Sequence, residues 1–178
     1  MNGATTVANS SSVTCPRSCK QDQRDERHIA ALHVEAARQH AAAADAHALA
    51  VEMHSEVVAP SEEAPDTIVF EANNASADAA TQGDTAAEAS SIAGVSFSEI
   101  SEALREAADA LRQAEDGEDP RDAHAVAAKF HAAAARLHAG VAEVLAPGRE
   151  EAEDARAEAE SAAMRCDDAV ACTLDCSS

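Results

Sequence analysis

The stretch HVEAARQHAAAADAH, residues 33–47, returns as HAVAAKFHAAAARLH at residues 124–138. Nine of the fifteen positions are identical, and three of those are histidines seven residues apart. Because an α-helix turns by about 100° per residue, a step of seven returns to nearly the same face, with a drift of roughly 20°. Each copy therefore predicts a helix that carries one row of histidines. Seven of the eight histidines in the chain lie in these rows: His33, His40, His47, His54, His124, His131 and His138.

Small apolar residues occupy the helix positions on both sides of each histidine row. Charged residues such as Glu35, Arg38 and Asp45 fall on the opposite half of the first helix. Alanine allows two helices to approach closely, so the histidines are expected in a helix–helix interface and not on the solvent face. The small residues beside the rows are Ala36, Ala37, Ala43, Ala44, Ala50, Val51, Val57 and Val58, then Ala127, Ala128, Ala134, Ala135, Val141 and Ala142.

The composition limits the size of any core. Of 178 residues, 48 are alanine, whereas Leu, Ile, Val and Phe together number 26, about 15% of the chain. That is below the roughly 20% under which highly charged chains are usually disordered. A single chain can bury little large apolar surface, so we expect homo-oligomerisation or a helical protein partner.

The charge balance narrows the classes of partner. With 33 acidic and 13 basic residues, the formal net charge is −20. Such a surface repels nucleic acid and anionic membranes. The N-terminal residues lack the apolar segment of a secretory signal, so a cytoplasmic location is expected.

Breaker residues divide the chain into segments of an all-α fold. Residues 1–22 are expected to be a disordered tail, 23–59 an Ala/His-rich amphipathic helix, and 60–95 a disordered acidic Ser/Ala linker. Residues 96–147 are predicted to form a helical hairpin, and 148–178 an acidic Ala-rich helix with a Cys-bearing tail. Ser96 and Glu99 match a capping box. Asp119 and Pro120 suit the start of the second hairpin helix, and Pro147 and Gly148 suit its end.

Three roles for the histidine rows are open. They can be hydrogen-bonded core residues, or a proton-linked switch, since seven interface histidines with pKa near 6.5 would charge together as the pH falls. They can also bind Zn²⁺, Ni²⁺ or Cu²⁺. Histidines seven apart lie roughly 10.5 Å apart along a helix, so any metal site has to combine two or more helices.

Catalytic signatures are missing from the sequence, and an enzyme is not expected. It contains no Gly-rich phosphate loop, GxSxG elbow or HExxH, and few large residues to build a dry pocket.

The five cysteines lie near the chain ends, in CPRSC (15–19), at Cys166 and in CTLDC (172–176). Unpaired tail thiols are the simplest interpretation, with a redox-controlled link between the ends as the alternative.

The segment GEDPRDAHAVAAKFHAAAARLHAG, residues 117–140, resembles small bacterial proteins built on Ala/His heptads with HxxAAxxH repeats. Residues 33–54 share the resemblance more loosely. The resemblance implies an amphipathic helix that begins after a Gly-Asp turn. It implies no activity. The sequence therefore predicts a non-enzymatic helical interaction protein that self-associates through its Ala/His faces and needs no cofactor. The alternative is a transition-metal-binding protein that uses interhelical histidines.

Overall fold

The computed structural model describes residues 17–58, 66–93 and 119–175, and these ranges contain helices and no strands. The predicted all-α class is confirmed. The helices are α1 (Arg17–Val58), α2 (Asp66–Ile92), α4 (Pro120–Leu145) and α5 (Glu150–Asp175).

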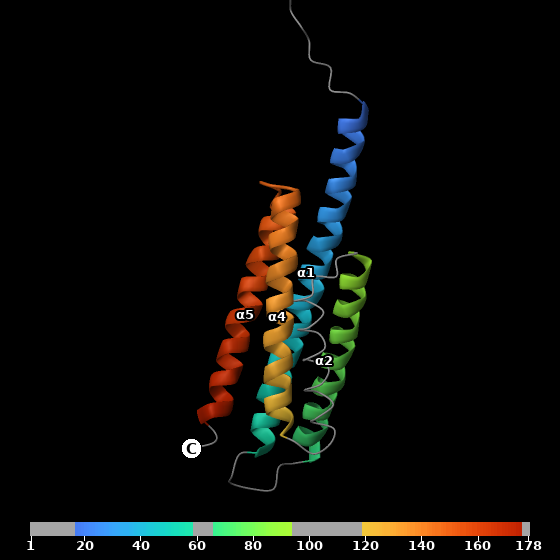
Figure 1. The fold of residues 1–178 in the computed structure, drawn as a ribbon. Helices are drawn as coiled ribbons and strands as arrows, with labels where there is room; N and C mark the ends of the chain where they lie inside the picture. Colours follow the sequence, from blue (N-terminus) through green and yellow to red (C-terminus); the bar gives the residue numbers. More distant parts are fainter. Residues whose placement is uncertain (1–16, 59–65, 94–118, 176–178) are drawn as a thin grey trace, which may run out of the picture.

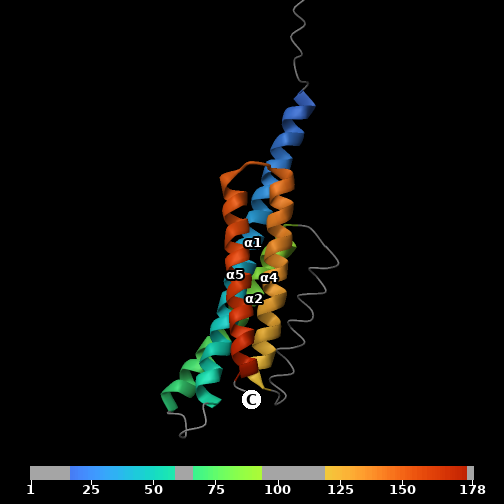
Figure 2. The same cartoon turned by 90° about the vertical axis from the view of Figure 1, so that its left-hand side faces the viewer.

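The four helices form a bundle around the pair α1 and α4, which run side by side in opposite directions (Figure 1). Helix α1 packs against each of the other three helices, and α5 packs against both α1 and α4. Helices α5 and α2 lie on opposite sides of the central pair (Figure 1). The N-terminal turns of α1 extend beyond the rest of the bundle in both views (Figure 2).

Helix α4 begins and ends where the sequence predicts. The carboxylate of Asp119 accepts a hydrogen bond from the backbone N–H of Arg121 at 3.0 Å, and Pro120 opens the helix. After the cap at Ala146, Gly148 adopts a φ of +69°, a left-handed conformation that glycine takes without strain. This turn reverses the chain into α5. The capping box at Ser96 and Glu99, and with it the first helix of the predicted hairpin, lies outside the described residues.

The expected linker at 60–95 is wrong for residues 66–92, which form α2. Alanines at a heptad spacing give this helix a buried stripe of Ala72, Ala79 and Ala86, and Ala93, directly after the helix, keeps the same spacing. The residues between these alanines are mostly polar and exposed, so the seven-residue period is difficult to recognise in the sequence. The expected N-terminal tail is likewise helical from Arg17, and α5 continues to Asp175.

Alanine fills the interface of α1, α4 and α5. One buried cluster joins Ala44 of α1, Ala135 of α4 and Ala162 of α5, each fully inaccessible to solvent. Cys166 completes this cluster at 1% exposure and carries a free thiol, so it is a core residue and not a tail residue. Burial raises the pKa of this thiol to about 11.

Ion pairs fix the position of α5 at the edges of this interface. Arg165 of α5 contacts Asp45 of α1 at 2.5 Å, and Arg156 contacts Glu143 of α4 at 2.8 Å. Both pairs lie on the surface, where such contacts contribute about 0–1 kcal/mol each.

Candidate functional site: a buried histidine ladder

The two histidine rows face each other inside one chain, across the interface of α1 and α4. Because the helices are antiparallel, each step of seven residues up α1 meets a step of seven down α4. The Nδ1 atoms of the paired rings lie within hydrogen-bond distance: 2.8 Å for His33–His138, 3.0 Å for His40–His131 and 2.9 Å for His47–His124.

A second kind of contact joins successive pairs. His40 stacks on His138, His47 on His131 and His54 on His124, with ring centroids 5.6, 5.4 and 5.8 Å apart and interplanar angles of 14°, 13° and 15°. Hydrogen-bonded and stacked contacts thus alternate along the interface. The seven imidazoles form one continuous zigzag, which we call the histidine ladder: His33, His138, His40, His131, His47, His124 and His54 in spatial order.

The ladder is buried among alanines, as predicted. His33, His40, His47 and His138 are 0% exposed, and His124 and His131 are 4% and 3% exposed. The flanking residues Ala36, Ala37, Ala127 and Ala128 are also inaccessible. Only His54, at the end of the ladder, is partly exposed.

Helix α2 supplies hydroxyl groups to the ladder. The Ser90 hydroxyl lies 2.7 Å from Nε2 of His40 and 2.9 Å from Nε2 of His138, so it bridges one stacked pair. Ser76 bridges His54 and His124 in the same way, at 2.8 and 2.9 Å. Each of these four rings therefore has a polar contact at Nε2, and three of them also have an Nδ1 partner in the opposite row. Buried polar groups are usually satisfied in this way.

Sequence reasoning did not identify Ser76 and Ser90. The signal was present, since both fall four residues after a buried alanine of α2 and hence on the same helix face. The Ser- and Ala-rich composition of residues 60–95 predicts a linker, which conceals this helix face. The polar partners of the histidines are therefore hydroxyl groups from α2, and not carboxylates from α1 or α4.

Burial keeps the ladder neutral. Desolvation is the main cause that lowers the pKa of His40 and His47 to about 3, and the nearby imidazole of His131 lowers both further. Desolvation likewise lowers the pKa of His124, His131 and His138 to about 4. A neutral imidazole has one donor and one acceptor nitrogen, which fits an Nδ1 contact in which one ring donates and the other accepts.

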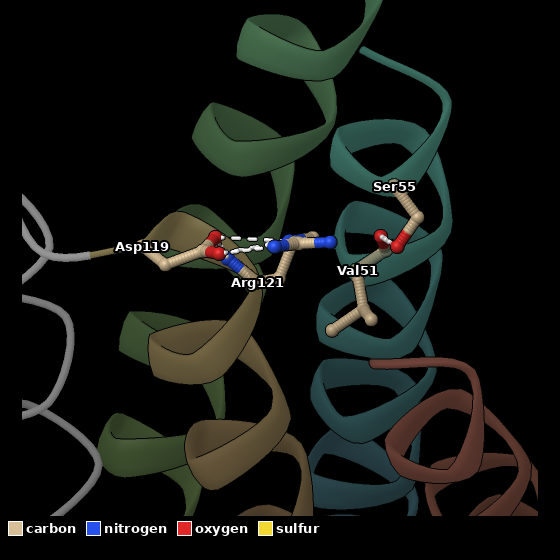
Figure 3. A network of polar contacts seen from close by, with 4 residues as sticks. All are labelled: Val51, Ser55, Asp119 and Arg121. Carbon is tan, nitrogen blue, oxygen red and sulfur yellow. Dashed lines mark hydrogen bonds and ion pairs between the residues drawn. The ribbon is translucent and has the colours of Figure 1, made fainter. Parts of the chain in front are cut away.

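An ion pair lies at the His54 end of the ladder. Asp119 binds Arg121, whose side chain extends from the start of α4 toward α1 (Figure 3). Close to its tip, Ser55 donates a hydrogen bond to the Val51 carbonyl oxygen. Desolvation lowers the pKa of His54, the Asp119 carboxylate opposes this shift, and Arg121 adds to it. At this end the ladder is partly exposed to solvent and lies near the charged side chains of Asp119 and Arg121.

Six of the seven predicted metal ligands meet in three Nδ1 pairs, and His54 belongs to none of these pairs. Within the described residues, no group of three or more His, Cys, Asp or Glu side chains is arranged to hold a metal ion. Two nitrogens bound to one tetrahedral Zn²⁺ at about 2.0–2.1 Å would lie roughly 3.3 Å apart. The Nδ1 pairs are closer than that, and their spacing matches a hydrogen bond.

The chain matches no protein-family model, no curated protein and no solved structure. None of the described helices is long and apolar enough to cross a membrane.

Proposed function

We propose that this chain is a non-enzymatic helical interaction protein whose Ala/His interface opens when the histidine ladder is protonated. The observation that carries the proposal is the set of three Nδ1–Nδ1 contacts at 2.8–3.0 Å in a buried interface. Each contact requires one proton between two nitrogens. If both rings are protonated, two N–H groups point at each other and two cations lie side by side in a poorly solvated site.

Protonation of the ladder histidines stabilises the unfolded chain relative to the folded bundle. In the unfolded chain a histidine has a pKa near 6.5, whereas five ladder histidines have values of about 3 to 4 in the bundle. Below pH 6.5 the unfolded state binds more protons, so the free energy of unfolding decreases as the pH falls. The bundle keeps its full stability above that pH and loses it in mild acid.

The opened faces suit self-association. Residues 33–47 and 124–138 are identical at nine of fifteen positions, all of them His or Ala, and each row already pairs with a copy of its own pattern. A helix released from one chain can therefore pair with the matching face of a second chain through the same contacts. Partial opening near the midpoint of the acid transition favours this exchange.

The test follows helicity and mass together. We expect the full chain to be helical at pH 7.5, and to lose helical circular dichroism and change its mass by light scattering between about pH 6 and 5. A variant with His40→Gln and His131→Gln removes one rung, so its transition should take up about two fewer protons. His28→Gln is the matched control, because His28 is an exposed histidine of the same helix outside the ladder. An acid transition unchanged in the double variant would contradict the proposal.

Transition-metal binding is the second candidate function, with Zn²⁺, Ni²⁺ or Cu²⁺ held between the two rows. Each of the pairs His33–His138, His40–His131 and His47–His124 brings together two imidazole nitrogens from different helices. Such a metal would have to displace the shared protons and spread the rungs apart. Stoichiometric Zn²⁺ binding with a gain of thermal stability, lost in the His40→Gln/His131→Gln variant, would support it. Full stability in chelator without any response to these ions would exclude it.

A further inference from the structure

Helix α2 presents three small residues to the ladder at a heptad spacing: Ser76, Gly83 and Ser90. Each faces one of the stacked histidine pairs. Ser90 bridges His40 and His138, and Ser76 bridges His54 and His124, with all four oxygen–nitrogen distances between 2.7 and 2.9 Å. Gly83 faces the middle pair, His47 and His131.

The contacts at Gly83 leave a buried nitrogen of the ladder without a partner. A Cβ atom on Gly83 would lie 3.3 Å from Nε2 of His131 and 3.8 Å from Nε2 of His47, so both nitrogens point toward this residue. His47 is 0% exposed, and within the described part of the chain its Nε2 is buried with no hydrogen-bond partner. A polar atom in this state costs the desolvation of the group without any compensating bond.

The flanking pairs indicate which kind of group satisfies these nitrogens. At Ser76 and Ser90 it is a single oxygen that can both donate and accept, placed on the α2 side of two stacked rings. The Ser76 hydroxyl also lies 3.2 Å from the carbonyl oxygen of Ala72, four residues earlier. Ala79 stands in the same relation to Gly83 and offers the same helix carbonyl. Two imidazole nitrogens and one carbonyl provide the roughly three partners that buried water molecules typically have.

We propose that Gly83 forms a binding site for one water molecule, which hydrogen-bonds Nε2 of His47 and Nε2 of His131 and joins the ladder into a proton relay running from His54 to His33. The relay depends on the ladder geometry and not on the acid-induced opening proposed above. From the exposed end, the relay passes through His54, Ser76, His124, His47, the water, His131, His40, Ser90, His138 and His33. The path spans 21 residues of α1, roughly 32 Å at 1.5 Å per residue.

Proton transfer along this path is balanced at every step. An imidazole that receives a proton on one nitrogen releases the proton held on its other nitrogen, and the hydroxyls and the water exchange protons in the same way. A proton that enters at His54 is finally taken up by Nδ1 of His33, which is buried, and it returns to solvent by the same steps in reverse, so only N–H and O–H bonds form and break. Afterwards each ring holds its proton on the opposite nitrogen, so the hydroxyls and the water have to turn before the next transfer in the same direction.

A matched pair of variants tests the water site. Gly83→Ser and Gly83→Ala add the same Cβ atom, with the same close contact to His131, and differ only by a hydroxyl group. Serine can replace the water as Ser76 and Ser90 do, whereas alanine displaces the water and leaves both nitrogens without a partner. We expect the folding equilibrium constant of Gly83→Ser to exceed that of Gly83→Ala by at least about tenfold. Equal stability of the two variants would overturn the water site.

The wild-type protein supplies an independent test, should neither variant fold. A high-resolution crystal structure at pH 7.5 should show one water within hydrogen-bond distance of both Nε2 atoms. A metal ion in that position, or no ordered scatterer, would overturn the proposal.

The relay is tested by hydrogen exchange of the imidazole N–H groups, followed by NMR on protein with ¹⁵N-labelled histidine. Protons enter at the partly exposed His54. In Gly83→Ala, exchange should therefore slow at least about tenfold at His131 and His40, beyond the blocked site, and stay unchanged at His124, before it. General destabilisation would accelerate exchange at all of them. Unchanged exchange at His131 and His40 would exclude the relay, while the acid-induced opening would remain testable by its own transition.

Discussion

Nδ1 of His40 lies 3.0 Å from Nδ1 of His131, although 91 positions separate the two residues in the chain. Both rings are almost completely buried, and each also lies against a ring from the next rung. One ring of the pair can donate and the other accept only while the two Nδ1 atoms share a single proton.

The free energy of unfolding should fall steeply in mild acid. Five ladder histidines have pKa values of about 3 to 4 in the bundle, against about 6.5 in the unfolded chain. Well below pH 6.5 each contributes about 1.4 kcal/mol per pH unit, so the five together remove roughly 7 kcal/mol per unit. Typical domains have only about 5–15 kcal/mol of stability. Urea titrations at pH 7.5, 6.5 and 6.0 measure the onset of this decrease, before the full slope is reached, and a flat profile would contradict the prediction.

Ser90→Ala should destabilise the bundle by about 1–3 kcal/mol, because it leaves Nε2 of both His40 and His138 buried without the bridging hydroxyl. The matched control is Thr81→Ala, which removes an exposed hydroxyl from the same helix. It should change the stability by less than about 0.5 kcal/mol. Thermal unfolding at pH 7.5 compares the two. Equal effects of the two substitutions would mean that the Ser90 hydroxyl does not stabilise the bundle.

Ala135→Leu should destabilise the bundle by about 1–3 kcal/mol or more, because Ala135 is 0% exposed in the interface of α1, α4 and α5. The larger side chain would force the helices apart and shift the ladder contacts. Ala133→Leu is the control on the same helix, since Ala133 is exposed. Chemical unfolding of both variants at pH 7.5 provides the comparison, and a tolerated leucine at 135 would contradict the close alanine packing.

Cys166 should react slowly with thiol reagents in the folded protein. Burial raises its pKa to about 11, so at pH 8 its thiolate fraction is at least ~100-fold below that of a free cysteine with pKa near 8.5. A variant that keeps Cys166 alone, with the other cysteines replaced by serine, isolates this thiol. Its labelling should be rapid in denaturant and slow without it. Fast labelling of the folded protein at pH 8 would show that the α5 interface is open.

Residue spacing alone predicts the helical rows of histidines and their burial. The seven-residue spacing puts His33, His40 and His47 on one face whatever else the chain does, because the helix period is fixed. Asp119, Pro120 and Gly148 likewise determine the limits of α4 locally, through one cap and one turn. These features depend on neighbours in the chain, so residue spacing is enough to predict them.

The contacts between the imidazole rings, and their contacts with α2, depend on how the helices pack. The antiparallel register pairs His40 with His131, and the side-by-side packing of α2 places Ser90 on the ladder and Gly83 against its middle pair. The helix period gives the direction of a side chain but not the partner helix or the offset along it. The lowered pKa values follow from that packing too, because desolvation depends on every helix that covers a ring. The chemistry of the ladder is therefore a property of three helices together.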